Sequence, residues 1–390
     1  MVISIPKKDV SDRRLAFLSE TQKIWLQKAR DFADRISLEE AIESDRTNVF
    51  RRDLFEAACK EGLGALPFPK EFGGSAGDYL SFVVVNEEFA RRCVPIMSSL
   101  GVHVLCQEPV YRFGSPEQKA KYLPPSSTGK YLAAFGLTEP AAGSDTAAIA
   151  CTAKIVGDEY LLNGTKVFIT SGASSDYFIV MARLLNSPEG LSNEKSITAF
   201  IVEKDFPGFK IGQKFDMLGM RGYSTCELVF DDCRVPKENL LGTHGQGRTV
   251  ALSSLAKGRV TIAAQCTGWA QAVLELLLKR VKEASAKEQD RLLLQIGEYA
   301  VLVESARVLT YQAAAAIDRG QADVVLASMA KMHASDAAMK ISTEAMTLLG
   351  FESSEPQYLL ERIFRDAKAG QIYEGANQIQ RMLIARELLK

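Results

Sequence analysis

The chain has 390 residues, of which 47% are hydrophobic, with 47 basic against 48 acidic side chains. This length and apolar content predict two or three domains with sizeable cores. The balanced charge gives no indication of binding to nucleic acid or to a membrane surface, and no apolar run approaches the length of a transmembrane helix.

The seven cysteines are dispersed without a C-x-x-C pair, which is typical of reduced, buried thiols. His103, His244 and His333 lie far apart without ligand spacing, so we expect no metal site. No signal or transit peptide is readable. We therefore expect a soluble, cytoplasmic protein whose chemistry, if it has any, uses carboxylates or an organic cofactor.

The first third of the chain has helical patterns. Apolar residues recur every three or four positions in residues 17–36, which predicts an amphipathic helix with Ile24 on its apolar stripe. Residues 80–93 and 96–113 are apolar nearly all round and predict buried helices. Ser115 and Pro116 predict the start of another helix. The stretch YLPPSSTGK, residues 122–130, is typical of a linker.

From Tyr131 to about Val235 the segments are short, β-branched and separated by turn signals, which predicts a β-rich domain. Asn163-Gly164 predicts a hairpin turn, followed by a strand with Lys166, Phe168 and Thr170 on one face. The glycine cluster at 242–247 matches no phosphate-binding loop and predicts a turn before a helix.

Long helical patterns return after Asn239. Helices, then strands, then helices predict an α+β protein of three blocks. We place an N-terminal α-helical domain at 1–128, a central β-barrel-like domain at 129–240 and a C-terminal α-helical bundle domain at 241–390.

Glu374 stands in GQIYEGANQIQR, just before a helix-like run and with no basic residue beside it in the sequence. The residues alone leave two interpretations open: a solvated carboxylate near a helix N-terminus, or a desolvated base with a raised pKa. Thr138 and Ser144, in AAFGLTEPAAGSD, can hydrogen-bond a heteroaromatic ring or a carbonyl. Phe168 and Thr170 can stack on and bond a flat ligand, although an ordinary half-buried strand has the same pattern.

Five motifs, in order over the whole chain, resemble those of the acyl-CoA dehydrogenase family. They are FGLTEPAAGSD, NGTKVFITSG, LGMRGYSTCELVFDDCRVPKENLLG, LLERIFRDAK and IYEGANQIQRMLIAREL. The resemblance implies an N-terminal helical domain, a central β-domain and a C-terminal four-helix bundle. It also implies an FAD-dependent enzyme that desaturates an acyl thioester between its α and β carbons. Glu374 would remove the α-proton, and the β-hydrogen would leave as hydride to the flavin.

The same resemblance implies roles for ten further residues. Phe135, Leu137, Thr138, Phe168, Thr170 and Gln378 would contact FAD, and Ser144, Arg259, Gly375 and Arg386 would contact the substrate. The implied partners are an acyl-CoA or an acyl carrier protein thioester, an electron acceptor (a flavoprotein or oxygen), and further copies of the chain in a dimer or tetramer. Ile96, Met97, Leu100 and Gly101 are expected to approach the acyl tail.

Several positions depart from the family pattern. The usual Leu-Asp-x-Gly-Arg has Ala256 in place of the Asp, which leaves a carrier-protein substrate open beside CoA. Ala376 replaces the usual Thr after the base. The Arg-x-x-Phe-Gly segment that binds the flavin pyrophosphate is missing, and residues 282–290 are expected to form a shortened loop.

The usual Gln-x-x-Gly-Gly has become Thr347 to Phe351. We therefore expect either a homodimer that holds the pyrophosphate with other donors, such as Arg280 or Lys282, or a mixed assembly with a related chain. A non-catalytic or half-site subunit of such an assembly is the alternative function.

Overall fold

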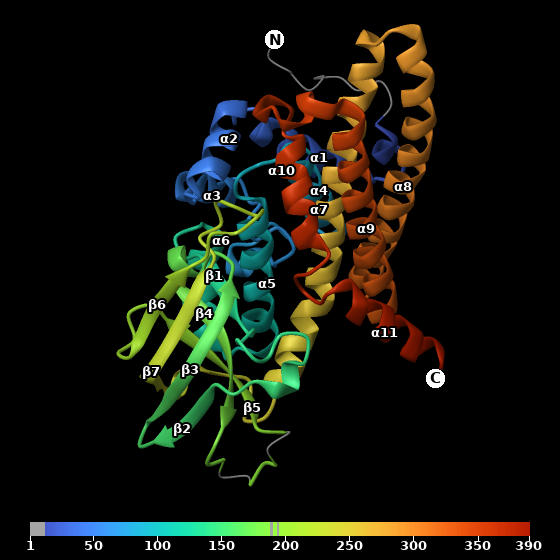
Figure 1. Cartoon of the computed structure of the whole chain (residues 1–390). Coiled ribbons are helices and arrows are strands. Elements are labelled where there is room, and N and C mark those ends of the chain that lie inside the picture. The colour runs from blue at the N-terminus through green and yellow to red at the C-terminus, as the bar shows by residue number, and fades with distance from the viewer. Residues whose placement is uncertain (1–11, 188–189, 193–194) are drawn as a thin grey trace.

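The computed structural model describes residues 12–187, 190–192 and 195–390. Helices at the N-terminus, a β-domain and long C-terminal helices follow one another along the chain (Figure 1). The predicted order of the three blocks is therefore confirmed. The β-domain lies at one end of the molecule, and the long helices extend away from it.

The N-terminal region packs around two buried helices, α4 and α5. Every residue of α4 is buried, because α1 covers one side and the C-terminal helix α7 the other. Ser115 caps α6 by accepting from the Gln118 N–H, with Pro116 in the first position, as predicted. The elements are η1 Arg13–Ala16, α1 Glu20–Ala33, α2 Leu38–Thr47, α3 Arg52–Lys60, η2 Lys70–Phe72, α4 Tyr79–Arg91, α5 Met97–Phe113 and α6 Pro116–Ser127.

Two predictions for this region are wrong. Ile24 is 63% exposed, because the capping box at Ser19 starts α1 in a register that turns Leu26, Ala29 and Phe32 toward the core instead. The YLPPSSTGK stretch is not a linker, since α6 continues through Pro124 and Pro125 to Ser127. Burial of Tyr122 and Leu123 stabilises this last part of the helix, although the two prolines have no backbone N–H to donate.

The β-domain is one sheet with the strand order β6-β7-β3-β2-β4-β5-β8, and β1 pairs in parallel with β4. Alternate residues of β4 and β5 belong to two different hydrophobic clusters, one shared with α5 and α6, the other with β3 and β7. The strands are β1 Ala133–Gly136, β2 Thr152–Val156, β3 Glu159–Ile169, β4 Tyr177–Leu184, β5 Ile197–Glu203, β6 Phe209–Lys214, β7 Cys226–Pro236 and β8 Leu240–Leu241, with short helices η3 Thr146–Ala148, η4 Gly172–Ser174 and η6 Lys237–Asn239.

Strand β3 corrects two further predictions. Asn163-Gly164 is not a hairpin turn but lies inside β3 at a register shift, where Gly164 has φ of +140° and an added Cβ would lie 2.9 Å from Cα of Cys151. A second shift separates Lys166 from Ile169. Lys166 is consequently fully buried while Phe168 is 57% exposed, so the two do not share a face.

The C-terminal region is a bundle of long helices in which α7, α8 and α9 pack together, with α10 against α9 (Figure 1). The glycine cluster at 242–247 forms the predicted turn, and α7 starts at Gly247. The elements are α7 Gly247–Glu283, α8 Ala286–Asp318, α9 Val324–Leu349, η7 Gly350–Ser354, η8 Pro356–Tyr358, α10 Leu360–Gly370 and α11 Asn377–Leu388.

Residues 282–290 do not form a loop, because α7 ends at Glu283 and α8 begins at Ala286. The two helices are joined by a connection of only two residues, Ala284 and Ser285. Arg280, one of the expected alternative donors, already bonds Oε1 of Glu352 at 3.1 Å.

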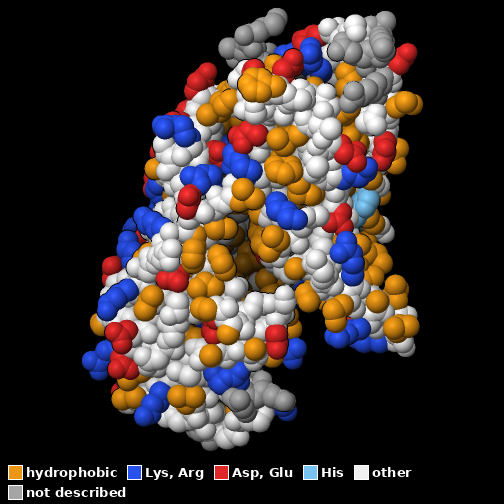
Figure 2. Space-filling model, in the orientation of Figure 1, with side chains coloured by type: hydrophobic (Ala, Val, Ile, Leu, Met, Phe, Trp, Pro, Cys, Tyr) orange, Lys and Arg blue, Asp and Glu red, His pale blue; other side chains and the backbone are white. Residues whose placement is uncertain are grey.

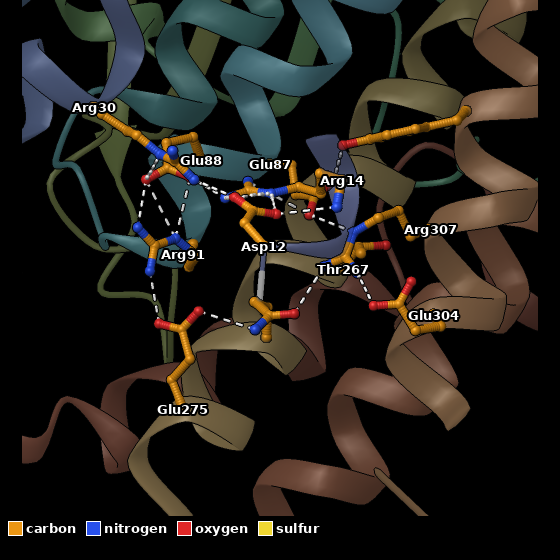
Figure 3. Close-up of polar contacts among 12 residues, drawn as sticks. Asp12, Arg14, Arg30, Glu87, Glu88, Arg91, Thr267, Glu275, Glu304 and Arg307 are labelled. Carbon is orange, nitrogen blue, oxygen red and sulfur yellow. Dashed lines mark hydrogen bonds and ion pairs between the residues drawn. The ribbon is translucent and has the colours of Figure 1, made fainter. Parts of the chain in front are cut away.

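Buried charges join the N-terminal segment to the bundle (Figure 3). Arg14 of η1 pairs with Glu88 of α4 at 2.8 Å, and Arg307 of α8 bonds Glu87 at 2.9 Å. These four side chains are almost completely buried. The buried charge network consists of Asp12, Arg14, Arg30, Glu87, Glu88, Arg91, Glu275, Glu304 and Arg307.

All seven cysteines are buried and free, as expected. Within the described ranges, no group of His, Cys, Asp and Glu side chains could hold a metal ion. No helix in the described part of the chain is both long and apolar enough to cross a membrane.

Candidate active site

Glu374 lies in the turn between α10 and α11, three residues before α11 begins at Asn377. Glu374 and Gly375 both have left-handed backbone conformations, with φ of +50° and +99°. The φ of Gly375 is one that residues with a side chain rarely adopt, which favours glycine here, and a Cβ would also lie 2.3 Å from Nε2 of Gln380.

The carboxylate of Glu374 points at Gly258 of α7, where an added Cβ would lie only 2.0 Å from Oε2. Part of the residue is accessible, but Oε2 is buried and has no hydrogen-bond partner. Burial raises the pKa of Glu374 to about 7, although Arg259 and Lys331 partly oppose the shift. The environment is therefore that of a desolvated carboxylate, and not that of a solvated group at a helix end.

The fold brings two cations to Glu374 that are distant in the sequence, which corrects the expectation of a carboxylate without basic neighbours. Arg259 of α7 is buried, and its Nε has no hydrogen-bond partner. Lys331 of α9 is fully buried and donates to the Gly375 carbonyl oxygen at 2.9 Å. Burial lowers the pKa of both cations, that of Lys331 to about 8.

Lys331 was missed by the sequence reasoning. The signal that could have found it is a lysine within SMAKMHASDAAM, a stretch of α9 with mostly small and apolar residues. Such a lysine has to be paired or desolvated when its helix is buried in a bundle.

A small cavity between α4, α5 and α7 adjoins Gly258. Tyr79 crosses it and donates to the Lys257 carbonyl oxygen at 2.7 Å, and Nζ of Lys257 pairs with Oε1 of Glu108 at 2.7 Å. The lining residues are Pro67, Tyr79, Phe82, Gly101, Val104, Leu105, Glu108, Ser254, Lys257, Gly258 and Thr261. Of the four residues expected near the acyl tail, Gly101 lies here; Ile96, Met97 and Leu100 are buried in the hydrophobic core.

The residues expected to bind the flavin come mainly from β1 and the end of β3. Phe135 is partly buried in β1, Leu137 is buried, and the Thr138 carbonyl oxygen accepts from the Val167 N–H at 2.9 Å. The chain after β1 therefore runs beside the end of β3. Gln378 lies exposed on the first turn of α11.

Phe168 and Thr170 follow on the β3 side. Phe168 has a left-handed φ of +56°, and its exposed ring lies 4.8 Å from that of Phe215. Thr170 is partly exposed just beyond β3, and the next residue, Ser171, donates to Oγ of Ser99 in α5 at 2.7 Å. The strand end is thereby fixed to the helix that carries Leu105.

An ion pair that the sequence reasoning missed fixes the loop with Ser144. Nζ of the buried Lys166 lies 2.7 Å from Oε1 of Glu139 and also donates to the Leu137 carbonyl oxygen. Glu139 accepts from the N–H groups of Ala150 and Cys151. Both ends of the 139–151 loop are therefore tied to β3.

These features fit a flat aromatic cofactor such as a flavin. Figure 2 shows a deep hollow, bordered mainly by hydrophobic side chains, between the β-domain and the C-terminal helices. Phe168 offers an exposed aromatic face on a strained backbone, and Thr138 and Thr170 offer neutral hydroxyls. Uncharged donors and an aromatic ring match the chemistry of an isoalloxazine ring.

Two of the residues expected to contact the substrate meet in an open groove between the β-domain and α11. Ser144 lies on the β-domain side, and Arg386 lies on α11. The remaining lining residues are Asp145, Ile379, Met382, Leu383 and Glu387. The groove thus combines one basic and two acidic groups with apolar side chains on the helix.

The chain matches three family models along its length. They describe the acyl-CoA dehydrogenase N-terminal domain at residues 19–130, the middle domain at 134–233 and the C-terminal domain at 245–389. An acyl-CoA dehydrogenase of Bacillus subtilis is 38% identical over 378 residues, with 95% of this chain and 99% of the relative covered.

Solved structures agree with these matches. Butyryl-CoA dehydrogenase from Megasphaera elsdenii is similar at a TM-score of 0.91 and 36% identity, covering 96% of this chain and 99% of that one. The prolyl acyl carrier protein oxidase AnaB is similar at a TM-score of 0.89 and 29% identity, covering 95% of this chain and 99% of that one. With the geometry of the hollow, these findings identify a flavin-dependent acyl-thioester oxidoreductase with FAD as cofactor, and the chain belongs to the acyl-CoA dehydrogenase family.

Proposed function

We propose that Glu374 is the base that removes the α-proton of an acyl thioester during α,β-desaturation. The observation that carries this assignment is the unpartnered, buried Oε2, whose environment raises the pKa of the carboxylate to about 7. A base with such a pKa is about half ionised at neutral pH and binds a proton well when ionised, which suits general-base catalysis. Free lone pairs on Oε2 leave it available for the substrate.

The residues proposed to contact FAD are Phe135, Leu137, Thr138, Phe168, Thr170 and Gln378. When bound, FAD supplies the acceptor for the β-hydride. On the protein side, the strained backbone at Phe168 presents a ring, and Thr138 and Thr170 supply neutral hydrogen bonds. Burial of Oε2 excludes water from the base and strengthens its electrostatic interactions.

The substrate is proposed to enter through the groove that joins Ser144 to Arg386. Arg386 offers a charge for the phosphates of CoA or of a phosphopantetheine arm. Further in, Arg259 and the turn at Gly375 lie beside the carboxylate. The small cavity at Gly258, with the Glu108–Lys257 ion pair in its wall, favours a short acyl group because a long alkyl chain would contact charges there.

The carrier of the acyl group is either CoA or an acyl carrier protein. The butyryl-CoA dehydrogenase and the prolyl acyl carrier protein oxidase, both similar to this chain, represent the two cases. We favour CoA, because Ser144 and Arg386 remain available in the groove although Ala256 lacks a carboxylate. Turnover of one acyl group presented on each carrier tests this choice, and faster turnover of the carrier-protein thioester would contradict it.

Assembly into a homo-oligomer is also proposed. Leu294, Val301 and Val308 follow one another at intervals of seven residues on α8, and all three are exposed. An apolar line of this kind on a long helix is typical of a helix–helix interface between subunits. The domain limits 1–128, 129–240 and 241–390, the electron acceptor and the cytoplasmic location stay predictions.

The decisive experiment compares the purified protein with Glu374→Gln. We expect the flavin absorbance of the wild type to bleach on addition of butyryl-CoA, and the variant to keep its flavin but to bleach about a hundred to ten thousand times more slowly. A flavin-free protein that gains flavin and activity only with a related chain would instead favour the alternative of a non-catalytic subunit. Bleaching of the variant at the wild-type rate would remove Glu374 from the mechanism.

A further inference from the structure

Lys331 of α9 lies against the turn that presents Glu374. Its Nζ donates hydrogen bonds to the Gly375 carbonyl oxygen and to Oδ1 of Asn377, both at 2.9 Å. Asn377 in turn donates from Nδ2 to Oγ of Ser335 in α9, at 2.9 Å. The ammonium group therefore joins the turn to the core of the bundle.

The turn needs such a support because its backbone is strained. Two successive left-handed residues, the first of them with a side chain, persist only where the surroundings hold them. The Gly375 carbonyl oxygen, directly after Glu374, accepts from Lys331 and also from Nε2 of Gln380 at 2.9 Å. One charged donor and one neutral donor thus fix the same oxygen atom.

We propose that Lys331 is a positioning residue for the base: its ammonium group fixes the Gly375 carbonyl, directs the Glu374 carboxylate at Gly258 and stabilises it in the ionised form. The inference rests on the proposed role of Glu374 as the base. Lys331 itself touches neither substrate nor flavin in this scheme, and acts through the turn and through its charge.

The electrostatics of the site support this role. Lys331 and Arg259 are the two cations that lower the pKa of Glu374 against the effect of burial. The groups facing Glu374 or Lys331 from the surrounding elements are Tyr79 of α4, Cys106 of α5, Arg259 and Cys266 of α7, Asp336 of α9 and the adjacent Tyr373. Burial raises the pKa of the two tyrosines and the two cysteines, which are therefore neutral near pH 7.

The test compares two variants of the flavin-loaded enzyme, Lys331→Met and Gln380→Met. Each removes one hydrogen bond to the Gly375 carbonyl oxygen, but only the first removes a charge. The rate of flavin reduction by a thioester that the wild type accepts is measured from about pH 5 to pH 9. In Lys331→Met, we expect the pH at which the rate reaches half its maximum on the acid side to rise by about one pH unit. Gln380→Met should slow flavin reduction without changing that midpoint.

A titration without turnover gives an independent result. The carboxyl infrared band of Glu374 is isolated as the difference between the enzyme and Glu374→Gln, once with Lys331 present and once in Lys331→Met. We expect the midpoint of this titration to be about one pH unit higher in Lys331→Met than with Lys331 present. Should Lys331→Met fail to fold, Lys331→Gln keeps a polar donor in the buried site without the charge and is measured in its place.

The outcomes separate this inference from the proposed function. If no acyl thioester bleaches the wild-type flavin, or if Glu374→Gln leaves the rate unchanged, the assignment of the base is wrong. If reduction depends on Glu374 but the midpoints of the wild type and the uncharged Lys331 variant coincide, Lys331 is overturned as a positioning residue while the base stands.

Discussion

Gly258 of α7 lies directly against the carboxylate of Glu374, with room for a hydrogen atom but not for a methyl group. An added Cβ would lie 2.0 Å from Oε2 of Glu374 and 2.6 Å from Cδ1 of Leu105. The local backbone does not require glycine at this position, because Gly258 lies inside a long α-helix, where glycine is unfavourable. The close approach of the Glu374 carboxylate explains why a glycine stands here.

Gly258→Ala is therefore expected to separate stability from activity. The added methyl group favours the helix by about 0.5–1 kcal/mol, while the carboxylate is displaced. A displacement of about 1 Å costs on the order of a hundredfold in rate. We expect flavin reduction to slow by about that factor with little change in Tm. Gly297→Ala on α8, where an added Cβ meets no atom within 4 Å, is the control and should leave the rate unaltered.

Glu374 is also expected to destabilise the protein at neutral and higher pH. Its folded-state pKa of about 7 lies above the ordinary value of 4.5, so the folded state binds the proton more tightly than the unfolded state. Stability is therefore lost as pH rises from about 4.5 to about 7, and the loss is complete above that range. We expect Glu374→Gln to have a higher Tm than the wild type at pH 8 and nearly the same Tm at pH 4.5. Thermal unfolding of both proteins at the two pH values measures this, and an equal difference at both would contradict the raised pKa.

Local patterns in the sequence were sufficient for the order of the three blocks and for the buried helices α4 and α5. A helix that is apolar nearly all round has to be buried, whichever elements pack against it. The position of Glu374 before α11 could also be predicted, since the Gly-Ala pair and the following helical run mark a helix start. Its environment could not, because Arg259 and Lys331 reach it from helices more than forty residues away along the chain.

The errors in β3 have a similar origin. Asn163-Gly164 is a strong local turn signal. In the fold, however, β3 pairs with β2 and β7 on its two sides, so the strand stays extended and the glycine lies at a shift in its pairing register with β7. The shortened loop was expected at residues 282–290, KEASAKEQD, from the comparison with the family pattern, but these residues belong mostly to the ends of α7 and α8. Polar side chains on an exposed helix end have the same composition as a loop, so composition alone does not distinguish them.

Breaking the buried ion pair of Lys166 and Glu139 should weaken the flavin side of the site. Lys166→Met leaves the Glu139 carboxylate buried without its cation, which typically costs about 3–5 kcal/mol. We expect a lower Tm and a weaker retention of flavin, because the 139–151 loop is tied to β3 through this pair. Adding Glu139→Gln to Lys166→Met removes the unpaired charge, so the double variant should recover part of the lost Tm. A double variant less stable than Lys166→Met would show that the carboxylate is compensated elsewhere.

The buried charge network predicts that the protein unfolds on mild acidification. Burial alone would raise the pKa of Glu88, but Arg14, Arg91 and Arg30 surround it and hold its pKa well below the ordinary value. The pKa of Asp12 is likewise lowered. For a carboxylate with a lowered folded-state pKa, the stabilisation is present above the unfolded value, 4.5 for Glu88, and is lost as pH falls below it. We expect Tm to fall steeply below about pH 4.5, together with undocking of the η1 segment.

Arg14→Met tests the origin of this acid sensitivity. Since Arg14 is buried and pairs with Glu88 at 2.8 Å, its loss leaves a buried carboxylate with fewer cations. The variant should be less stable at pH 7, and its Tm should fall less between pH 7 and pH 4, because the wild-type advantage depends on an ionised Glu88. Arg46→Met is the matched control: this arginine pairs with Glu43 on the surface of α2, and such exposed pairs contribute little. If Arg14→Met and Arg46→Met have the same pH dependence as the wild type, the network does not determine acid stability, and the carboxylates responsible lie elsewhere in the chain.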